Sequence, residues 1–148
     1  MSYSNEIAKE LNELLEKNYD AEAGYKKAAE DVKNQALKNY FTSRAKDRYD
    51  FGHQLKDEIK SFGESPEKGT SLKGDLHRSW MDLKSAFSSD KEESILEEAV
   101  RGEKAAIEDY NKIIAKNDLP PSTENLIIRQ RNSVESALDE IKSLEALS

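Results

Sequence analysis

Apolar residues recur at steps of three and four along most of this chain, which is the spacing of one face of an α-helix. The first such stripe, which starts at Ile7, predicts a helix over residues 4–33. A second stripe predicts a helix over residues 35–62, which should end before Gly63 because glycine readily adopts the left-handed conformation that closes a helix. These two helices are expected to form a hairpin with a short turn.

The same spacing returns in the C-terminal part of the chain. It predicts a helix over residues 90–116 and another over residues 122–147, separated by the helix-breaking pair Pro120–Pro121. Ser122 is well placed to cap the last helix, because its hydroxyl can accept a hydrogen bond from a backbone N–H. A short connection makes neighbouring helices run antiparallel, so we expect a second hairpin.

A long connection over residues 63–89 joins the two hairpins. It starts with a polar loop that contains glycine and proline, and it then carries a shorter amphipathic stretch that predicts an extra helix over residues 71–87. Such a connection can run the length of the bundle, as in ferritin-like folds, or decorate a simple up-down-up-down bundle, and the pattern alone does not choose. We expect one all-α domain over residues 1–148, a ferritin-like antiparallel four-helix bundle.

The composition is typical of a helical domain with hydrated outer faces. Of the 148 residues, 36% are hydrophobic and 36% are charged. The absence of cysteine excludes disulfides, thiolate metal sites and cysteine nucleophiles, and it favours the cytoplasm. We expect no membrane span, because no apolar run is long enough, and no nucleic-acid partner, because a net charge of −7 repels phosphate groups.

Polar residues interrupt each apolar stripe close to the middle of its helix. Because mid-helix positions meet at the same height in an antiparallel bundle, these side chains should converge on one buried layer, with two tyrosines about one turn away. The predicted layer comprises Asn18, Glu22, Asp47, Arg48, Glu103 and Gln130, with Tyr25 and Tyr110 beside it.

Buried carboxylates are costly unless they are paired or bind a cation, so the predicted layer needs a positive charge. In one interpretation Arg48 neutralises the carboxylates, while amide and phenol groups complete the hydrogen bonding and fix the register of the helices. In the alternative, a divalent metal such as Mn, Fe or Mg binds to an all-oxygen site. The candidate ligands are Glu22, Asp47, Glu103 and Gln130. We prefer the first interpretation, because Arg48 is already available as the counter-charge.

Two parts of the sequence carry a family resemblance. One is the run Leu-His-Arg-Ser-Trp-Met-Asp-Leu-Lys at residues 76–84, followed by Ile-Leu-Glu-Glu at 95–98 and Arg-Gly-Glu at 101–103. The other is Asp-Ala-Glu-Ala-Gly-Tyr at residues 20–25. Together they resemble a bacterial family of domains of unknown function that has a ferritin-like four-helix-bundle fold. The resemblance implies the fold, but that family has no established activity to carry over.

The wider ferritin-like superfamily binds two metal ions through a Glu on two helices and a Glu-x-x-His motif on the other two. Glu22 and Glu103 match the first pair. His53 has the right spacing from Asp50, but it lies on the side of its helix away from the apolar stripe and should face water. Leu138 occupies the position that needs the second histidine. The complete di-metal motif is therefore absent, and ferroxidase or peroxidase chemistry is disfavoured.

The remaining residues give little support for an enzyme. His77 lies near Trp80 without a carboxylate or nucleophile partner, so hydrogen bonding to a helix end explains it more simply. No serine lies in a nucleophile elbow, and no glycine-rich loop could bind phosphate. We therefore expect a non-enzymatic structural or interaction protein that forms a homodimer. The alternative is a metal-binding oxidoreductase or metal-storage protein.

Overall fold

The computed structural model describes residues 3–66, 92–116 and 118–147. Over these ranges the chain forms four long helices, whose ends lie within two residues of the predicted bounds. The helices are α1 (Tyr3–Asp31), α2 (Gln35–Ser61), α4 (Glu92–Ile114) and α5 (Pro121–Leu147). The extra helix predicted over residues 71–87 lies outside the described residues. No described helix combines the length and the apolarity that crossing a membrane requires.

Side chains from both helices complete the turn of the first hairpin. Asn34 caps α2, since its Oδ1 accepts a hydrogen bond from the backbone N–H of Leu37 at 3.2 Å. The last turn of α1 has no basic residue, and Lys38 of α2 supplies a cation there by donating to the carbonyl of Ala29 at 3.0 Å. The chain leaves α2 through Gly63, whose φ of 77° is left-handed, as expected for a glycine after a helix.

Helix α5 begins one residue earlier than predicted, and Ser122 does not cap it. The first backbone hydrogen bond runs from the N–H of Glu124 to the carbonyl of Pro120 at 2.9 Å, which places a proline in the first turn, where its missing N–H costs nothing. The Ser122 and Thr123 hydroxyls instead donate to the carboxylate of Glu58 on α2, at 3.0 and 2.7 Å. A negative charge from another helix therefore sits at the positive end of the α5 dipole.

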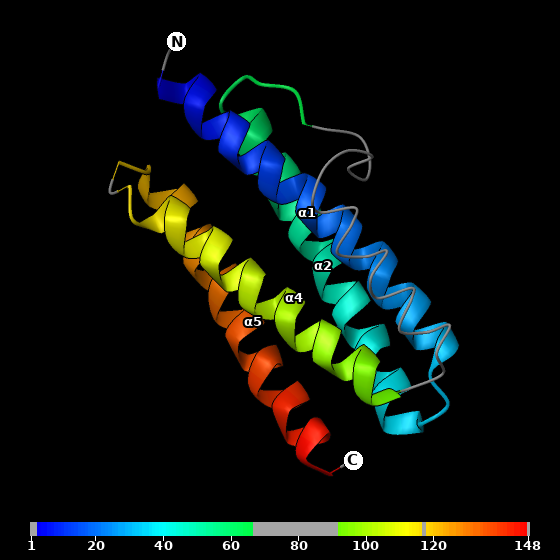
Figure 1. The fold of residues 1–148 in the computed structure, drawn as a ribbon. Coiled ribbons are helices and arrows are strands. Elements are labelled where there is room, and N and C mark those ends of the chain that lie inside the picture. Colours follow the sequence, from blue (N-terminus) through cyan, green and yellow to red (C-terminus); the bar gives the residue numbers. More distant parts are fainter. Residues whose placement is uncertain (1–2, 67–91, 117, 148) are drawn as a thin grey trace.

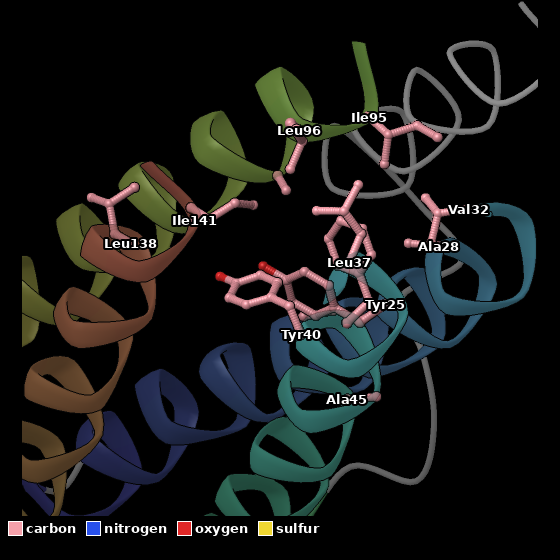
Figure 2. Packing of buried hydrophobic residues seen from close by; sticks show 13 residues of the cluster. Tyr25, Ala28, Val32, Leu37, Tyr40, Ala45, Ile95, Leu96, Leu138 and Ile141 are labelled. Carbon is pink, nitrogen blue, oxygen red and sulfur yellow. The ribbon is translucent and has the colours of Figure 1, made fainter. Parts of the chain in front are cut away.

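Two apolar clusters fill the interior, one toward each end of the bundle. The first apolar cluster, drawn in Figure 2, comprises Ala21, Tyr25, Ala28, Val32, Leu37, Tyr40, Phe41, Ala45, Ile95, Leu96, Ala99, Leu138 and Ile141. The second comprises Ile7, Leu11, Leu14, Leu15, Phe51, Leu55, Ile59, Tyr110, Ile113, Leu126, Ile127 and Val134. Because burying one large aliphatic side chain contributes about 1.5–3 kcal/mol, these clusters supply most of the favourable free energy of folding.

The end of α2 and the start of α4 lie at opposite ends of the bundle (Figure 1). Ile59 near the end of α2 belongs to the same cluster as Leu11 near the start of α1, whereas Ile95 at the start of α4 belongs with Val32, just after α1. Helix α4 therefore lies beside α1 and antiparallel to it, and α5 lies likewise beside α2. An up-down-up-down bundle would bring the end of α2 and the start of α4 together, so the structure has the ferritin-like crossover topology.

The two hairpins differ in how tightly their helices pack. Within each hairpin the helices approach closely along their length, whereas helices of different hairpins approach closely at fewer points. One edge between hairpins carries the ion pair of Lys17 on α1 with Asp109 on α4, at 2.9 Å. Another link is the hydrogen bond from the Tyr40 hydroxyl on α2 to the carbonyl of Ala137 on α5, at 2.9 Å. Polar contacts therefore join the two hairpins in addition to the apolar clusters that they share.

Candidate functional site

A set of buried polar side chains lies between the two apolar clusters, and one of its members, Tyr110, also belongs to the second cluster. Its members come from all four described helices and are between 0% and 4% exposed. We call this set the polar layer, and it comprises Asn18 on α1, Arg44 and Arg48 on α2, Glu103 and Tyr110 on α4, and Gln130 on α5. In an interior made otherwise of aliphatic and aromatic groups, each of these side chains needs a hydrogen-bonding partner.

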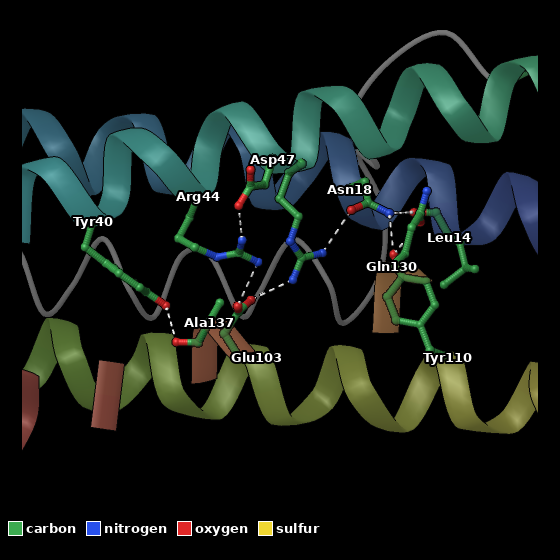
Figure 3. Close-up of polar contacts among 10 residues, drawn as sticks. Leu14, Asn18, Tyr40, Arg44, Asp47, Glu103, Tyr110, Gln130 and Ala137 are labelled. Carbon is green, nitrogen blue, oxygen red and sulfur yellow. Dashed lines mark hydrogen bonds and ion pairs between the residues drawn. The ribbon is translucent and has the colours of Figure 1, made fainter. Parts of the chain in front are cut away.

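The centre of the polar layer is the carboxylate of Glu103, which is 0% exposed. Arg48 donates from Nη2 to Oε1 at 2.6 Å, and Arg44 donates from Nη2 to Oε2 at 3.1 Å (Figure 3). Each carboxylate oxygen therefore has its own guanidinium. Such charge-assisted hydrogen bonds are about twice as strong as neutral ones, and they hold α2 against α4.

Opposing effects act on the pKa of Glu103. Burial works to raise the pKa, because it removes the charged form from water, whereas Arg48 and Arg44 lower it and a hydrogen bond from Tyr25 lowers it further. The balance puts the pKa of Glu103 below its ordinary value, so the carboxylate is ionised at neutral pH. In the same way burial alone would lower the pKa of each arginine, but the charge of Glu103 raises it.

Arg44 connects the buried carboxylate to the surface. Its Nη1 donates to Oδ2 of Asp47, one turn along α2, at 2.5 Å. The Asp47 side chain is 40% exposed, whereas the Arg44 side chain is 3% exposed. The cluster has no net charge, because the two positive charges of Arg44 and Arg48 balance the two negative charges of Glu103 and Asp47.

Neutral groups continue the polar layer toward α1. Arg48 donates from Nη1 to Oδ1 of Asn18 at 2.9 Å, and the Asn18 amide donates to the carbonyl of Leu14 at 2.9 Å and to the Tyr110 hydroxyl at 3.4 Å. Burial raises the pKa of Tyr110 above its ordinary value, so the phenol stays protonated and can donate.

Gln130 completes the polar layer on α5. Its Oε1 accepts from the Tyr110 hydroxyl at 2.8 Å, and its Nε2 donates to Gln54 at 3.0 Å and to the carbonyl of Phe51 at 3.3 Å. The hydrogen bonds therefore form one continuous path, from Gln54 on the surface through the core to Asp47 on the surface.

Most residues of the predicted layer meet in the structure. Those that do are Asn18, Arg48, Glu103, Gln130 and Tyr110, with Asp47 at the edge and Tyr25 bonded to Glu103. Glu22 has a different environment, because its carboxylate forms an ion pair with Lys26 on its own helix at 2.8 Å and its side chain is 15% exposed. The prediction that Glu22 belongs with Glu103 in one buried network is not supported by these contacts.

Arg44 is the residue of the polar layer that the sequence analysis missed. Its position was available in the pattern, because positions 37, 41, 44, 48, 51, 55 and 59 recur at steps of three and four. Arginine is rarely buried unless it is paired, so the neighbouring Ala45 is the more obvious buried position in this stretch. The partner that makes burial of Arg44 possible is Glu103, which lies on another helix.

The arrangement does not fit the all-oxygen metal site considered for Glu22, Asp47, Glu103 and Gln130. Among the residues that the structure describes, no group of three or more Asp, Glu, His or Cys side chains is placed to hold a metal ion. His53 is exposed, as predicted, and its ring packs edge-on against Tyr49 at 4.5 Å between centroids. The oxygens of Glu103, the only one of these carboxylates in the core, already accept hydrogen bonds from arginine.

Comparison with known proteins agrees with this architecture. Residues 6–116 match the model of a family described as a domain of unknown function, DUF2383. The chain belongs to this family. None of the curated proteins matches it in sequence. The DUF2383 chain has the fold of a Dps1 mutant of Mycobacterium smegmatis, with a TM-score of 0.76 and 17% sequence identity over 98% of this chain and 99% of that one.

The chemistry of the polar layer in this DUF2383 chain is that of a structural network. The pKa of Glu103 is lowered and those of Arg44 and Arg48 are raised, so the carboxylate stays ionised and both arginines stay protonated. Burial also raises the pKa of Tyr25 and of Tyr40. A general acid or base needs a pKa near the working pH, and none of these shifts moves a group toward neutrality. The geometry therefore suits the fixing of helix positions better than proton transfer.

Proposed function

We propose that this DUF2383 protein is a non-enzymatic helical bundle that acts by association, as a homodimer in the cytoplasm. The observation that carries the non-enzymatic part of the proposal is that both carboxylate oxygens of Glu103 already accept a hydrogen bond, one from Arg44 and one from Arg48. The lack of cysteine supports the cytoplasm, and the net charge of −7 argues against a nucleic-acid partner.

The role proposed for the polar layer is to select one register. A buried ion pair is often no more stable than apolar residues of the same volume, so stability alone does not account for it. Arg44 and Arg48 are one turn apart on α2, so a shift of α4 by one turn along α2, about 5.4 Å, would leave Glu103 within reach of only one of them. Breaking one buried ion pair in this way would cost several kcal/mol, which makes the observed register the favoured one.

The proposed dimer is supported by an aromatic pair on the outer side of α2. Tyr49 is 52% exposed, which is unusual for a large aromatic side chain in the described part of the chain, and the ring of His53 packs against it. Aromatic side chains are enriched at protein interfaces. Light scattering coupled to gel filtration should give twice the chain mass of 16.8 kDa, and Tyr49→Ser should lower the dimer fraction. A monomer at all concentrations would overturn the dimer.

Metal analysis tests the non-enzymatic part of the proposal. Protein purified without chelators should contain no stoichiometric Mn, Fe or Mg, and added metal should leave the melting temperature unchanged. Glu103→Ala serves as the comparison, because it removes the buried carboxylate. Stoichiometric metal in the natural protein that is lost in Glu103→Ala would replace this proposal with a metal-binding function.

A further inference from the structure

We propose that Asp47 and Glu103 form a binding site for a small planar cation, in which the Arg44 side chain is a tethered ligand that a free guanidinium ion can replace. This site is independent of whether the protein forms a dimer.

The contacts of Arg44 have the geometry of a bound ligand. Its Nη1 donates to Asp47 at 2.5 Å and its Nη2 donates to Glu103 at 3.1 Å, so two carboxylates from different helices hold the two arms of one flat head group. The Arg44 side chain is only 3% exposed, so its head group is buried, unlike that of a surface ion pair. Guanidinium suits the site because its N–H groups diverge in one plane, whereas an ammonium ion concentrates its donors at one point.

Charge balance decides which class of ion the site takes. With Arg44 present, the positive charges of Arg44 and Arg48 cancel the negative charges of Asp47 and Glu103. Removing the Arg44 head group leaves one net negative charge at an interior position, where it is poorly solvated. A singly charged cation restores neutrality, whereas a divalent metal would leave an excess positive charge beside Arg48.

Solvent can reach this site from the side of Asp47. The Asp47 side chain is 40% exposed and contacts the Arg44 head group directly, so a cavity left by truncating Arg44 borders the surface. Arg48 provides the contrast, because its head group lies between Glu103 and Asn18 in the interior. An external ion should therefore enter in place of Arg44 more readily than in place of Arg48.

The test compares Arg44→Ala with Arg44→Met in thermal melts. Methylguanidinium chloride is added up to the order of 10 mM, where its denaturing effect is negligible, against sodium chloride at the same ionic strength. Above its Kd, each tenfold increase in methylguanidinium should raise the melting temperature of Arg44→Ala by roughly 4 °C. Arg44→Met should respond less, because its side chain occupies the space of the arginine stem and leaves a smaller cavity. Adding Asp47→Asn to Arg44→Ala should abolish the response, because it removes one carboxylate.

The outcomes separate the proposal from its rivals. Equal responses of Arg44→Ala and Arg44→Met would show that the ion acts on the whole surface, and they would overturn the site. Stabilisation of Arg44→Ala by MnCl2 but not by methylguanidinium would overturn the assignment of the ligand. If Arg44→Ala is unfolded without added cation, methylguanidinium should restore its helical circular dichroism, and the absence of such recovery would equally overturn the proposal.

Discussion

The substitution Arg48→Met removes one guanidinium from the polar layer and little else. Methionine keeps the unbranched apolar stem of arginine, so the helix and the surrounding packing change little. The substitution leaves Oε1 of Glu103 without its 2.6 Å partner and Oδ1 of Asn18 without its 2.9 Å donor. Because Glu103 is 0% exposed, water does not readily replace the lost donor.

The expected loss of stability is about 3 kcal/mol. Breaking a buried ion pair by removing one partner costs about 3–5 kcal/mol, most of which is the penalty of leaving a charge unpaired. The lower end applies here, because Arg44 still binds Oε2 of Glu103 and the buried thioether adds some apolar contact. For a chain of this length the loss corresponds to a fall in melting temperature of roughly 9 °C.

Urea unfolding followed by circular dichroism measures this effect directly, with the free energy obtained by linear extrapolation. Arg129→Met is the matched control, since Arg129 is an exposed arginine in α5 and the same substitution there should cost less than about 0.5 kcal/mol. If Arg48→Met were as stable as the control, the polar layer would not depend on the pairing of charges, and Arg48 would not be a counter-charge that Glu103 requires.

Glu103→Gln should change how the stability of the protein responds to acid. The pKa of Glu103 lies below its ordinary value in the folded protein. The stability that the ionised carboxylate contributes is therefore complete above about pH 4.5 and is lost as the pH falls through the folded-state pKa. Natural protein should therefore lose more unfolding free energy than Glu103→Gln on acidification, and equal losses in urea titrations would contradict this. Tyr110→Phe should cost about 1–2 kcal/mol in the same assay, because Oε1 of Gln130 loses its 2.8 Å donor inside the core. Glu58→Ala should cost about 1 kcal/mol, because the buried Thr123 hydroxyl loses its acceptor at the start of α5, and no change in melting temperature would argue against that contact.

The helices follow from the sequence because their signals are local. A stripe with a period of three and four residues, a capping Asn34 and a left-handed Gly63 act within one or two turns, and the structure places the helix ends accordingly. Ser122 shows the limit of this reasoning. A serine near a helix start is a reasonable cap, but the neighbouring prolines already begin the helix, and Glu58 of another helix accepts its hydroxyl.

The polar layer could be predicted in part for a similar reason. Asn18, Arg48, Glu103 and Gln130 interrupt their stripes near mid-helix, so the antiparallel arrangement alone brings them to one height. Glu22 was misassigned because it lies at the edge of its stripe, where Lys26 of the next turn can pair with it near the surface. No pattern within α1 shows whether Glu22 joins the buried layer or pairs with Lys26 near the surface.

Arg44 and the crossover were decided only by the tertiary structure. Arg44 is buried because Glu103, 59 residues away in the chain, offers it a carboxylate, and no local property of α2 records that partner. The crossover topology and the up-down-up-down topology would both bury the apolar stripes. The periodicity of the sequence therefore does not predict the direction of the second hairpin. The sequence by itself thus determined which faces of the helices are buried, whereas the pairing of charges between helices and the order of the helices in space depend on contacts between distant segments.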